Sequence, residues 1–193
     1  MMSGMLYELD VLKFKISRTL FTGTKKHKHM NHSMGSMKHK EMKSHNMPSE
    51  KPTWVYPHPN DKYIYVVNNG TDDVVEIDIN KWAISRKFKT DKGPYNCEVS
   101  PNGKFLVITY KSAAKTGIWD LKSGSELARI KNTRRITHGV VISPDSKYAF
   151  VSVEGVRGEP GSVDIFDLEN LRLVEYVEVG KQAGGIAFWK MTD

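Results

Sequence analysis

Histidine and methionine are concentrated in one stretch of this sequence, "KKHKHMNHSMGSMKHKEMKSHNM", which runs from Lys25 to Met47. The stretch holds five of the chain's seven histidines and five of its nine methionines. Imidazole nitrogen binds Cu(II), Zn and Ni, whereas thioether sulfur is soft and favours Cu(I) or Ag(I). Both ligand types at close, irregular spacing predict several adaptable copper sites rather than one rigid cage. The candidate ligands are His27, His29, Met30, His32, Met34, Met37, His39, Met42, His45 and Met47.

Two other interpretations of this stretch stay open. It has no aromatic residue and few large apolar ones, so it cannot bury enough surface to order itself without help. The first alternative is therefore a solvated, low-complexity linker that is rich in histidine and methionine by chance. The second is a basic segment that binds an anionic surface. Its lysines keep the stretch soluble and oppose the accumulation of cations, so we expect few metal ions per chain.

The rest of the sequence is an internal repeat that must position this stretch. "HPNDKYIYVVN" at 58–68, "SPNGKFLVITY" at 100–110 and "SPDSKYAFVSV" at 143–153 share one pattern, and their prolines are 42 and 43 residues apart. Each repeat contains four short segments of alternating β-branched or aromatic residues, separated by turn residues. Four strands in roughly 40–50 residues are typical of a propeller blade. The sequence thus predicts an all-β fold, a β-propeller of four-stranded antiparallel blades.

The ends of the chain fit the same register. "YELDVLKFKISRTLFT" at 7–22 aligns without gaps to "VEIDINKWAISRKFKT" at 75–90, and "AGGIAFWK" at 183–190 aligns to the first strand of a blade. Aspartates recur at one blade position, which indicates a structural hydrogen bond. We therefore expect the outer strands of a partial blade (1–24), the His/Met-rich insertion (25–51), three blades (52–93, 94–136 and 137–182) and the inner strand of a further or closing blade (183–193).

These residues resemble the YVTN-type β-propeller repeat. The segments that carry the resemblance are "SPNGKFLVITY", "SPDSKYAFVSV" and "KYIYVVNNGTDDVVEIDI". The resemblance implies a propeller fold but leaves function open, because the family includes binding scaffolds, surface-layer proteins and relatives of lactonases and of haem- or copper-containing oxidoreductases. Such propellers usually have seven blades, so we expect this chain to be part of a longer propeller whose missing blades are its partners.

The repeat also places the His/Met-rich stretch within the fold. Three residues separate Thr90 from Pro94, but 29 separate the equivalent Thr22 from Pro52. The stretch is therefore an insertion of 26 residues between the outer strand of one blade and the inner strand of the next. In a propeller this junction lies on the face where the central channel opens, which is a common place for ligand sites.

Four further residues near the start of inner strands are candidates for a ligand site at the channel mouth: His138, Arg135, Tyr95 and Trp54. His138 is a metal or ligand contact in one interpretation and a structural histidine bonded to neighbouring backbone in the other. Arg135, with Arg134 before it, is either an anion clamp or an exposed loop residue. The two aromatic residues, and Asn96 next to Tyr95, either line the channel or pack between blades.

Charge and composition exclude several classes of protein. The net charge is +7, but residues 25–51 contribute +5 of it, so the folded part is nearly neutral and nucleic acid is not an expected partner. No apolar run is long enough for a transmembrane helix, and no signal peptide is recognisable in this chain. The single cysteine, Cys97, rules out an internal disulfide and aligns with buried apolar positions.

We expect a propeller scaffold that binds copper, or a similar soft metal, through its His/Met-rich loop. The absence of thiolate ligands there suits an oxidising compartment, so the parent protein is expected in the bacterial periplasm or outside the cell. No nucleophile motif, phosphate loop or paired carboxylates occur, so catalysis is not expected from this chain. The alternatives are a lactonase-like hydrolase or copper/haem oxidoreductase with active groups in missing blades, and a protein-binding propeller with an inert insert.

Overall fold

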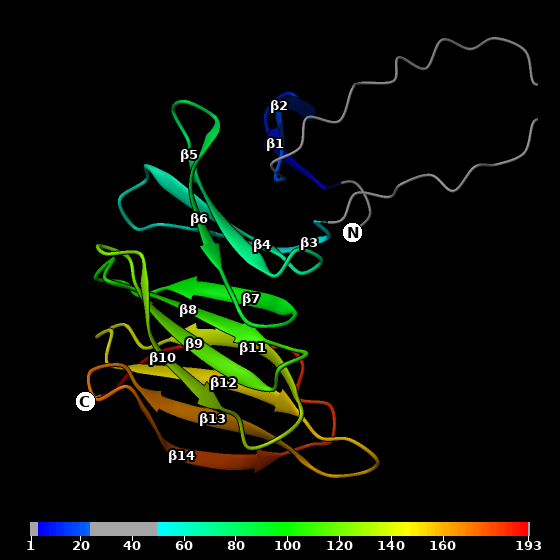
Figure 1. The fold of residues 1–193 in the computed structure, drawn as a ribbon, viewed down its shortest axis with the longest axis vertical. Coiled ribbons are helices and arrows are strands. Elements are labelled where there is room, and N and C mark those ends of the chain that lie inside the picture. Colours follow the sequence, from blue (N-terminus) through cyan, green and yellow to red (C-terminus); the bar gives the residue numbers. More distant parts are fainter. Residues whose placement is uncertain (1–3, 24–49, 193) are drawn as a thin grey trace, which may run out of the picture.

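The computed structural model describes residues 4–23 and 50–192, which form one strand pair and three four-stranded antiparallel sheets (Figure 1). Each sheet follows the order of its strands along the chain, as expected for blades. The strands are β1 (Met5–Asp10) and β2 (Lys15–Phe21); β3 (Pro52–Pro57), β4 (Tyr63–Asn68), β5 (Asp73–Asp78) and β6 (Ala83–Lys89); β7 (Pro94–Val99), β8 (Phe105–Tyr110), β9 (Lys115–Asp120) and β10 (Ser125–Lys131); β11 (Ile136–Ile142), β12 (Tyr148–Glu154), β13 (Gly161–Asp167) and β14 (Arg172–Val179). The predicted fold class, all-β with four-stranded antiparallel sheets, is confirmed.

The hydrophobic core consists of separate layers between neighbouring sheets. Because side chains alternate across a strand, each central strand supplies two of these layers. On β8, Leu106 and Ile108 pack towards the β3–β6 sheet, whereas Phe105 and Val107 pack towards the β11–β14 sheet. All six residues of β8 are buried for this reason. A strand that is apolar on both faces is thus sandwiched between two blades.

The turn between the third and fourth strands of each unit is built in the same way four times. Asp10, Asp78, Asp120 and Asp167 each accept hydrogen bonds from backbone N–H groups two or three residues later. This is the structural role that the sequence predicts for the recurring aspartate. The side chains act as Asx turns, which hold the chain reversal in place.

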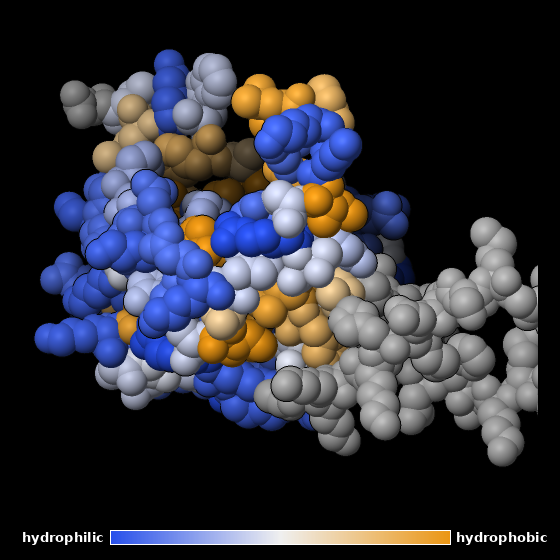
Figure 2. Space-filling view, turned by 90° about the horizontal axis from the view of Figure 1, so that it is seen from above, coloured by the Kyte–Doolittle hydropathy of each residue, from blue (hydrophilic) through white to orange (hydrophobic). Residues whose placement is uncertain are grey.

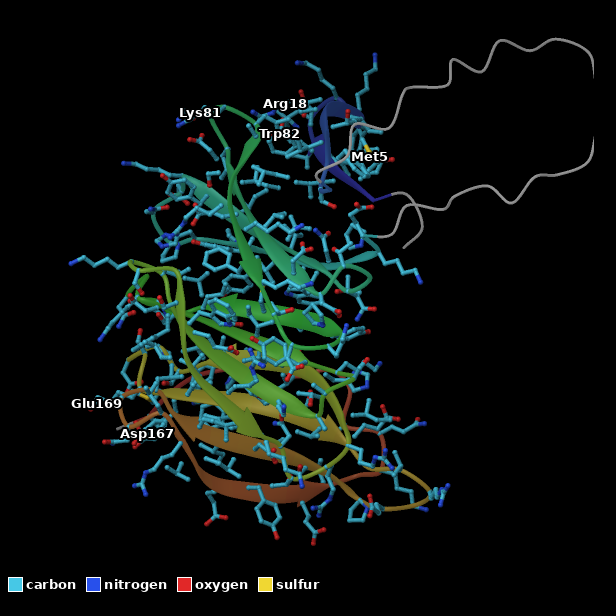
Figure 3. All side chains as sticks on the ribbon, viewed as in Figure 1. Met5, Arg18, Lys81, Trp82, Asp167 and Glu169 are labelled. Atoms are coloured by element: carbon cyan, nitrogen blue, oxygen red, sulfur yellow. The ribbon has the colours of Figure 1, made fainter. Side chains whose placement is uncertain are left out.

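Arginine side chains tie the first two units to the units that follow them. Arg18 is bonded to Glu8 of its own hairpin, and its guanidinium also donates to the carbonyl of Ile79 at 2.8 Å. It lies 4.2 Å from the centre of the Trp82 ring, and Figure 3 shows the two side chains together. Arg86 repeats the arrangement one blade later, because it donates to the carbonyl of Leu121 at 2.8 Å.

The C-terminal segment differs from the prediction. The sequence predicts an inner strand over 183–193, but residues 183–192 form no strand. The segment nevertheless lies beside β11 and β12, since Ser152 donates to the carbonyl of Gly184 at 2.8 Å and the ring of Phe188 lies 6.3 Å from that of Phe150. No second strand of a further blade is present in the described residues to pair with it, so the segment forms no strand ladder.

The β1–β2 hairpin and the β11–β14 sheet lie at opposite ends of the stack. Figure 1 shows β1 and β2 beyond the β3–β6 sheet, whereas β14 lies at the other end. The hairpin leaves apolar side chains in solvent, with Leu12 89% and Phe14 92% exposed. Viewed from this end, apolar residues form patches among hydrophilic ones (Figure 2).

Candidate functional site along the inner strands

All ten predicted metal ligands of the His/Met-rich stretch lie outside the described residues, but both ends of the insertion are described. Gly23 touches the Glu50 side chain so closely that a Cβ on this glycine would lie 2.1 Å from Glu50 Oε1. The Glu50 carbonyl accepts a hydrogen bond from Gly70 N–H at 2.8 Å. The insertion therefore leaves and re-enters the fold at one point, next to the loop between β4 and β5.

A buried polar network fixes that point. Thr22, at the end of β2, is fully buried and donates from its hydroxyl to Asn68 Oδ1 at 2.9 Å. The Asn68 amide donates in turn to the Thr22 carbonyl and to Asp73 Oδ1, at 3.2 and 2.9 Å. Because the polar groups of this network are paired with one another, they hold Thr22, which precedes the insertion, against the β4–β5 loop.

The inner strands β3, β7 and β11 lie next to one another and, with the C-terminal segment, line a groove of about 610 Å³. We call it the inner-strand groove. It brings together three of the four predicted channel-mouth residues, Trp54, Tyr95 and His138. The fourth, Arg135, lies exposed before β11 and does not line the groove. The walls are otherwise made of aromatic and small residues, with Asn96 and Glu98 as the further polar members.

His138 is held in one orientation by two neighbours. Its Nε2 lies 2.7 Å from Glu154 Oε2, and its side chain is 15% exposed. The ring packs edge-on against Tyr95 at 5.3 Å, and the other partner of Tyr95 is the Lys111 ammonium, 4.4 Å from the ring centre. His138 thus bonds to a carboxylate through its ring, rather than to neighbouring backbone. Because a carboxylate accepts hydrogen bonds, this contact favours a proton on His138 Nε2.

Comparison with solved structures places this arrangement among known folds. The chain is similar to Kuenenia stuttgartiensis hydrazine synthase, with 19% identity and a TM-score of 0.66 over 77% of this chain and 41% of that one. It is also similar to U3-55K and to the RRP9 WD40 repeats, each with 14% identity and a TM-score of 0.61 over 68% of this chain and 40% of theirs. WD40 repeats build propeller blades. The chain has a β-propeller fold.

The propeller described here is shorter than those it matches. The chain spans about two fifths of the length of these structures. Identities this low establish the fold alone and carry no function. No protein-family model matches the sequence, and a search of curated proteins finds no significant match.

Glu98 also lines the inner-strand groove, although the sequence analysis does not name it as a site residue. Burial raises the pKa of Glu98, although hydrogen bonds from Ile142 N–H, at 2.9 Å, and from the Tyr56 hydroxyl act in the opposite direction. The Tyr56 pKa is raised to about 12, by burial first and by the Glu98 charge second. The alignment of the repeats contains a signal for Glu98, because none of the equivalent residues is acidic. These residues are Tyr56, Val141 and Ala187.

Asn96 is a further polar residue of the groove, as its place at the start of an inner strand predicts. It is only 6% exposed, and its Oδ1 accepts no hydrogen bond from any described residue. Its backbone N–H is satisfied by Thr109 Oγ1 at 3.0 Å, so the side-chain oxygen is the part left unpaired. A buried amide oxygen without a donor costs free energy, and such groups point to an absent partner.

The predicted anion clamp is not formed by the two arginines. Arg134 turns away from the groove: it donates to the Pro160 carbonyl at 3.0 Å and to Glu178 at 2.8 Å. Its guanidinium also lies over the Tyr176 ring on β14. Arg135 has no side-chain hydrogen bond or ion pair within the described part of the chain, in keeping with its alternative reading as an exposed loop residue.

Two absences hold for residues 4–23 and 50–192. No group of three or more His, Cys, Asp or Glu side chains is placed to hold a metal ion there. No helix in these ranges is long and apolar enough to cross a membrane. Cys97 is fully buried, and burial raises the pKa of its thiol, so it offers no thiolate ligand.

Proposed function

We propose that this propeller is a scaffold that presents the His/Met-rich insertion as a copper-binding loop. The observation that carries the proposal is the meeting of Gly23 and Glu50 beside the β4–β5 loop, where the inner strand β3 is about to begin. A loop anchored at both ends on a rigid sheet brings its ligands to the channel face at little entropic cost, since loop length adds only slowly to that cost.

The chemistry of the donors favours copper over other metals. Five imidazoles and five thioethers on one loop provide ligands for both Cu(II) and Cu(I), so an ion that changes oxidation state stays bound. Because the only thiol of the chain is buried, copper has no competing thiolate ligand. A site of this kind suits the bacterial periplasm or the extracellular space, and a YVTN-type repeat is consistent with that location.

The test is copper titration of the full chain and of a variant lacking residues 24–49. This deletion joins Gly23 to Glu50 and leaves three residues between Thr22 and Pro52, the same number as between Thr90 and Pro94. The variant keeps both described ends of the insertion and should fold. We expect the full chain to bind Cu(I) and Cu(II), and the deletion variant to bind neither. Equal binding by the two proteins, or binding by neither, would overturn the proposal.

A second variant separates the two ligand types. Replacing the five loop methionines (Met30, Met34, Met37, Met42 and Met47) by leucine removes the soft donors and keeps the imidazoles. We expect weaker Cu(I) binding and little change for Cu(II). A matched replacement of the five loop histidines by asparagine should do the reverse. Equal losses for both ions in both variants would show that the loop does not distinguish oxidation states.

The second candidate function is a protein-binding propeller with an inert insert. It is favoured by the aromatic groove on the inner strands. The two functions separate in one experiment, because the deletion variant would then capture the same partners as the full chain while neither protein bound copper.

A further inference from the structure

Glu98 is a carboxylate without a counter-ion in an otherwise uncharged groove. No lysine or arginine lines the inner-strand groove, and Glu98 forms no ion pair within the described residues. Its two hydrogen-bond donors, Ile142 N–H and the Tyr56 hydroxyl, are both neutral. A carboxylate has about four lone-pair positions, so these two donors leave acceptor capacity facing the groove.

The blade repeat does not require an acid at this position. The equivalent positions hold no acidic residue: they are occupied by Tyr56 in β3, Val141 in β11 and Ala187 in the C-terminal segment. Burial disfavours the charged form of Glu98, as the raised pKa of this carboxyl shows. The carboxylate therefore costs the fold stability at neutral pH, and a bound cation would recover that free energy.

The groove walls suit an organic cation. Trp54 is 46% exposed, Tyr56 stands on the same strand, β3, and Tyr95 stands on the neighbouring strand β7. Aromatic faces attract ammonium and guanidinium groups, and Tyr95 already has the Lys111 ammonium over its ring at 4.4 Å. The unpaired Asn96 oxygen is a second acceptor, which a small turn of its terminal torsion would present to an N–H donor.

We propose that the inner-strand groove binds a small organic cation, an alkylammonium or alkylguanidinium group, with Glu98 as its counter-ion and Trp54 and Asn96 as further contacts. This site consists only of described residues. It is independent of the copper proposal, because none of its members belongs to the His/Met-rich insertion.

Calorimetric titration with butylammonium and butylguanidinium chloride tests the proposal, with pentanamide as a neutral ligand of similar length. We expect the full chain to bind at least one of the two cations more tightly than the amide. Glu98→Gln should weaken cation binding about tenfold or more, because it removes a charge-assisted hydrogen bond. The control Glu175→Gln, on the outermost strand β14, should bind as the unchanged protein does.

Stability measurements distinguish a lost site from a lost fold. Because the charged form of Glu98 is disfavoured by burial, Glu98→Gln should unfold at the same temperature as the unchanged protein or a higher one at pH 7. Unchanged cation binding in Glu98→Gln would overturn the proposal. Equal affinity for pentanamide would overturn it too, since the groove would then be an apolar slot only, and so would an absence of cation binding by the full chain.

The variant lacking residues 24–49 separates this proposal from the preceding one. It should keep its affinity for butylguanidinium whether or not it binds copper. If the deletion abolished cation binding while the fold persisted, the site would depend on the insertion and the assignment to the inner-strand groove would be wrong.

Discussion

At the scale of single residues, Glu76 shows how this fold stabilises a buried charge. Its carboxylate is 2% exposed and accepts hydrogen bonds from Tyr65 Oη at 2.8 Å, Ser85 Oγ at 2.6 Å and Arg86 Nε at 2.9 Å. Burial alone would raise the pKa of Glu76, but these three donors outweigh it and the pKa is lowered. Glu76 differs from Glu98 in this respect, because its charge has a full set of partners.

The lowered pKa of Glu76 gives a stability that depends on pH. A carboxyl with a lowered pKa in the folded state stabilises the fold above its unfolded pKa, and this contribution is lost as pH falls through the folded pKa. We expect Glu76→Gln to lower the free energy of unfolding by about 2 kcal/mol at pH 7, since a charged acceptor of three donors is replaced. Urea unfolding at pH 7 and pH 3 should show a gap that shrinks in acid. A gap of constant size would contradict the pKa argument, and Glu175→Gln is the exposed control.

His138, Tyr95 and Trp54 could be predicted as groove residues because their side chains are chemically distinctive and their place in the repeat was known. Glu98 is not predicted as a site residue because it lies within the short strand "YNCEV", where a polar residue between apolar ones is ordinary alternation. Its significance comes from a partner far away in sequence, the Ile142 N–H, which donates a hydrogen bond to Glu98. The alternation of polar and apolar residues predicts on which face of a strand a side chain lies. It does not predict which residues of other elements contact that side chain.

At the scale of the elements, one turn position adopts a left-handed backbone in every unit. Phe14, Trp82, Gly124 and Leu171 each follow the turn aspartate by four residues, with φ of 50°, 49°, 73° and 54°. Only the third of these is a glycine, which adopts this conformation without steric cost. The strand pattern could be read from the sequence because its period is regular. The left-handed backbone at this turn could not be predicted, because three of its four residues are large side chains that rarely adopt this conformation.

This position allows a paired test of backbone strain. Gly124→Ala should destabilise the protein by about 1 kcal/mol, because the nearest atoms leave room for a Cβ at 3.7 Å or more and the cost is conformational. Phe14→Gly should leave stability within about 0.5 kcal/mol, since the relief of strain is offset by the freer unfolded chain. Phe14 is exposed, so little packing is lost. Thermal unfolding of both variants decides the matter. Equal effects of the two substitutions would argue against strain at this turn.

At the scale of the whole molecule, the sequence was sufficient to identify the blades but not the behaviour of the chain ends. Repeats of 42 and 43 residues impose stacked sheets, because each sheet is apolar on both faces and needs a neighbour. The C-terminal segment has the sequence of an inner strand, yet a strand forms only where a ladder partner is present. The segment instead makes side-chain contacts with β12 through Ser152 and Phe150.

The distribution of charge over the molecule leads to the last prediction. Residues 24–49 contain six lysines and one glutamate, so deleting them lowers the net charge from +7 to +2. Binding of a basic protein to duplex DNA without sequence preference depends on the number of phosphates that its lysines and arginines neutralise. We therefore expect any DNA binding by the full chain at low salt to vanish in the deletion variant. Its elution from a cation exchanger should need less salt.

A second variant distinguishes charge from the presence of the segment. Replacing Lys25, Lys26, Lys28, Lys38, Lys40 and Lys43 by glutamine keeps every histidine and methionine. It should lose DNA binding as the deletion does, yet bind copper at least as well, because the lysines repel cations. DNA binding that survived in both variants with the same salt dependence would place a nucleic-acid site on the blades themselves. The nearly neutral surface of the described residues argues against that result.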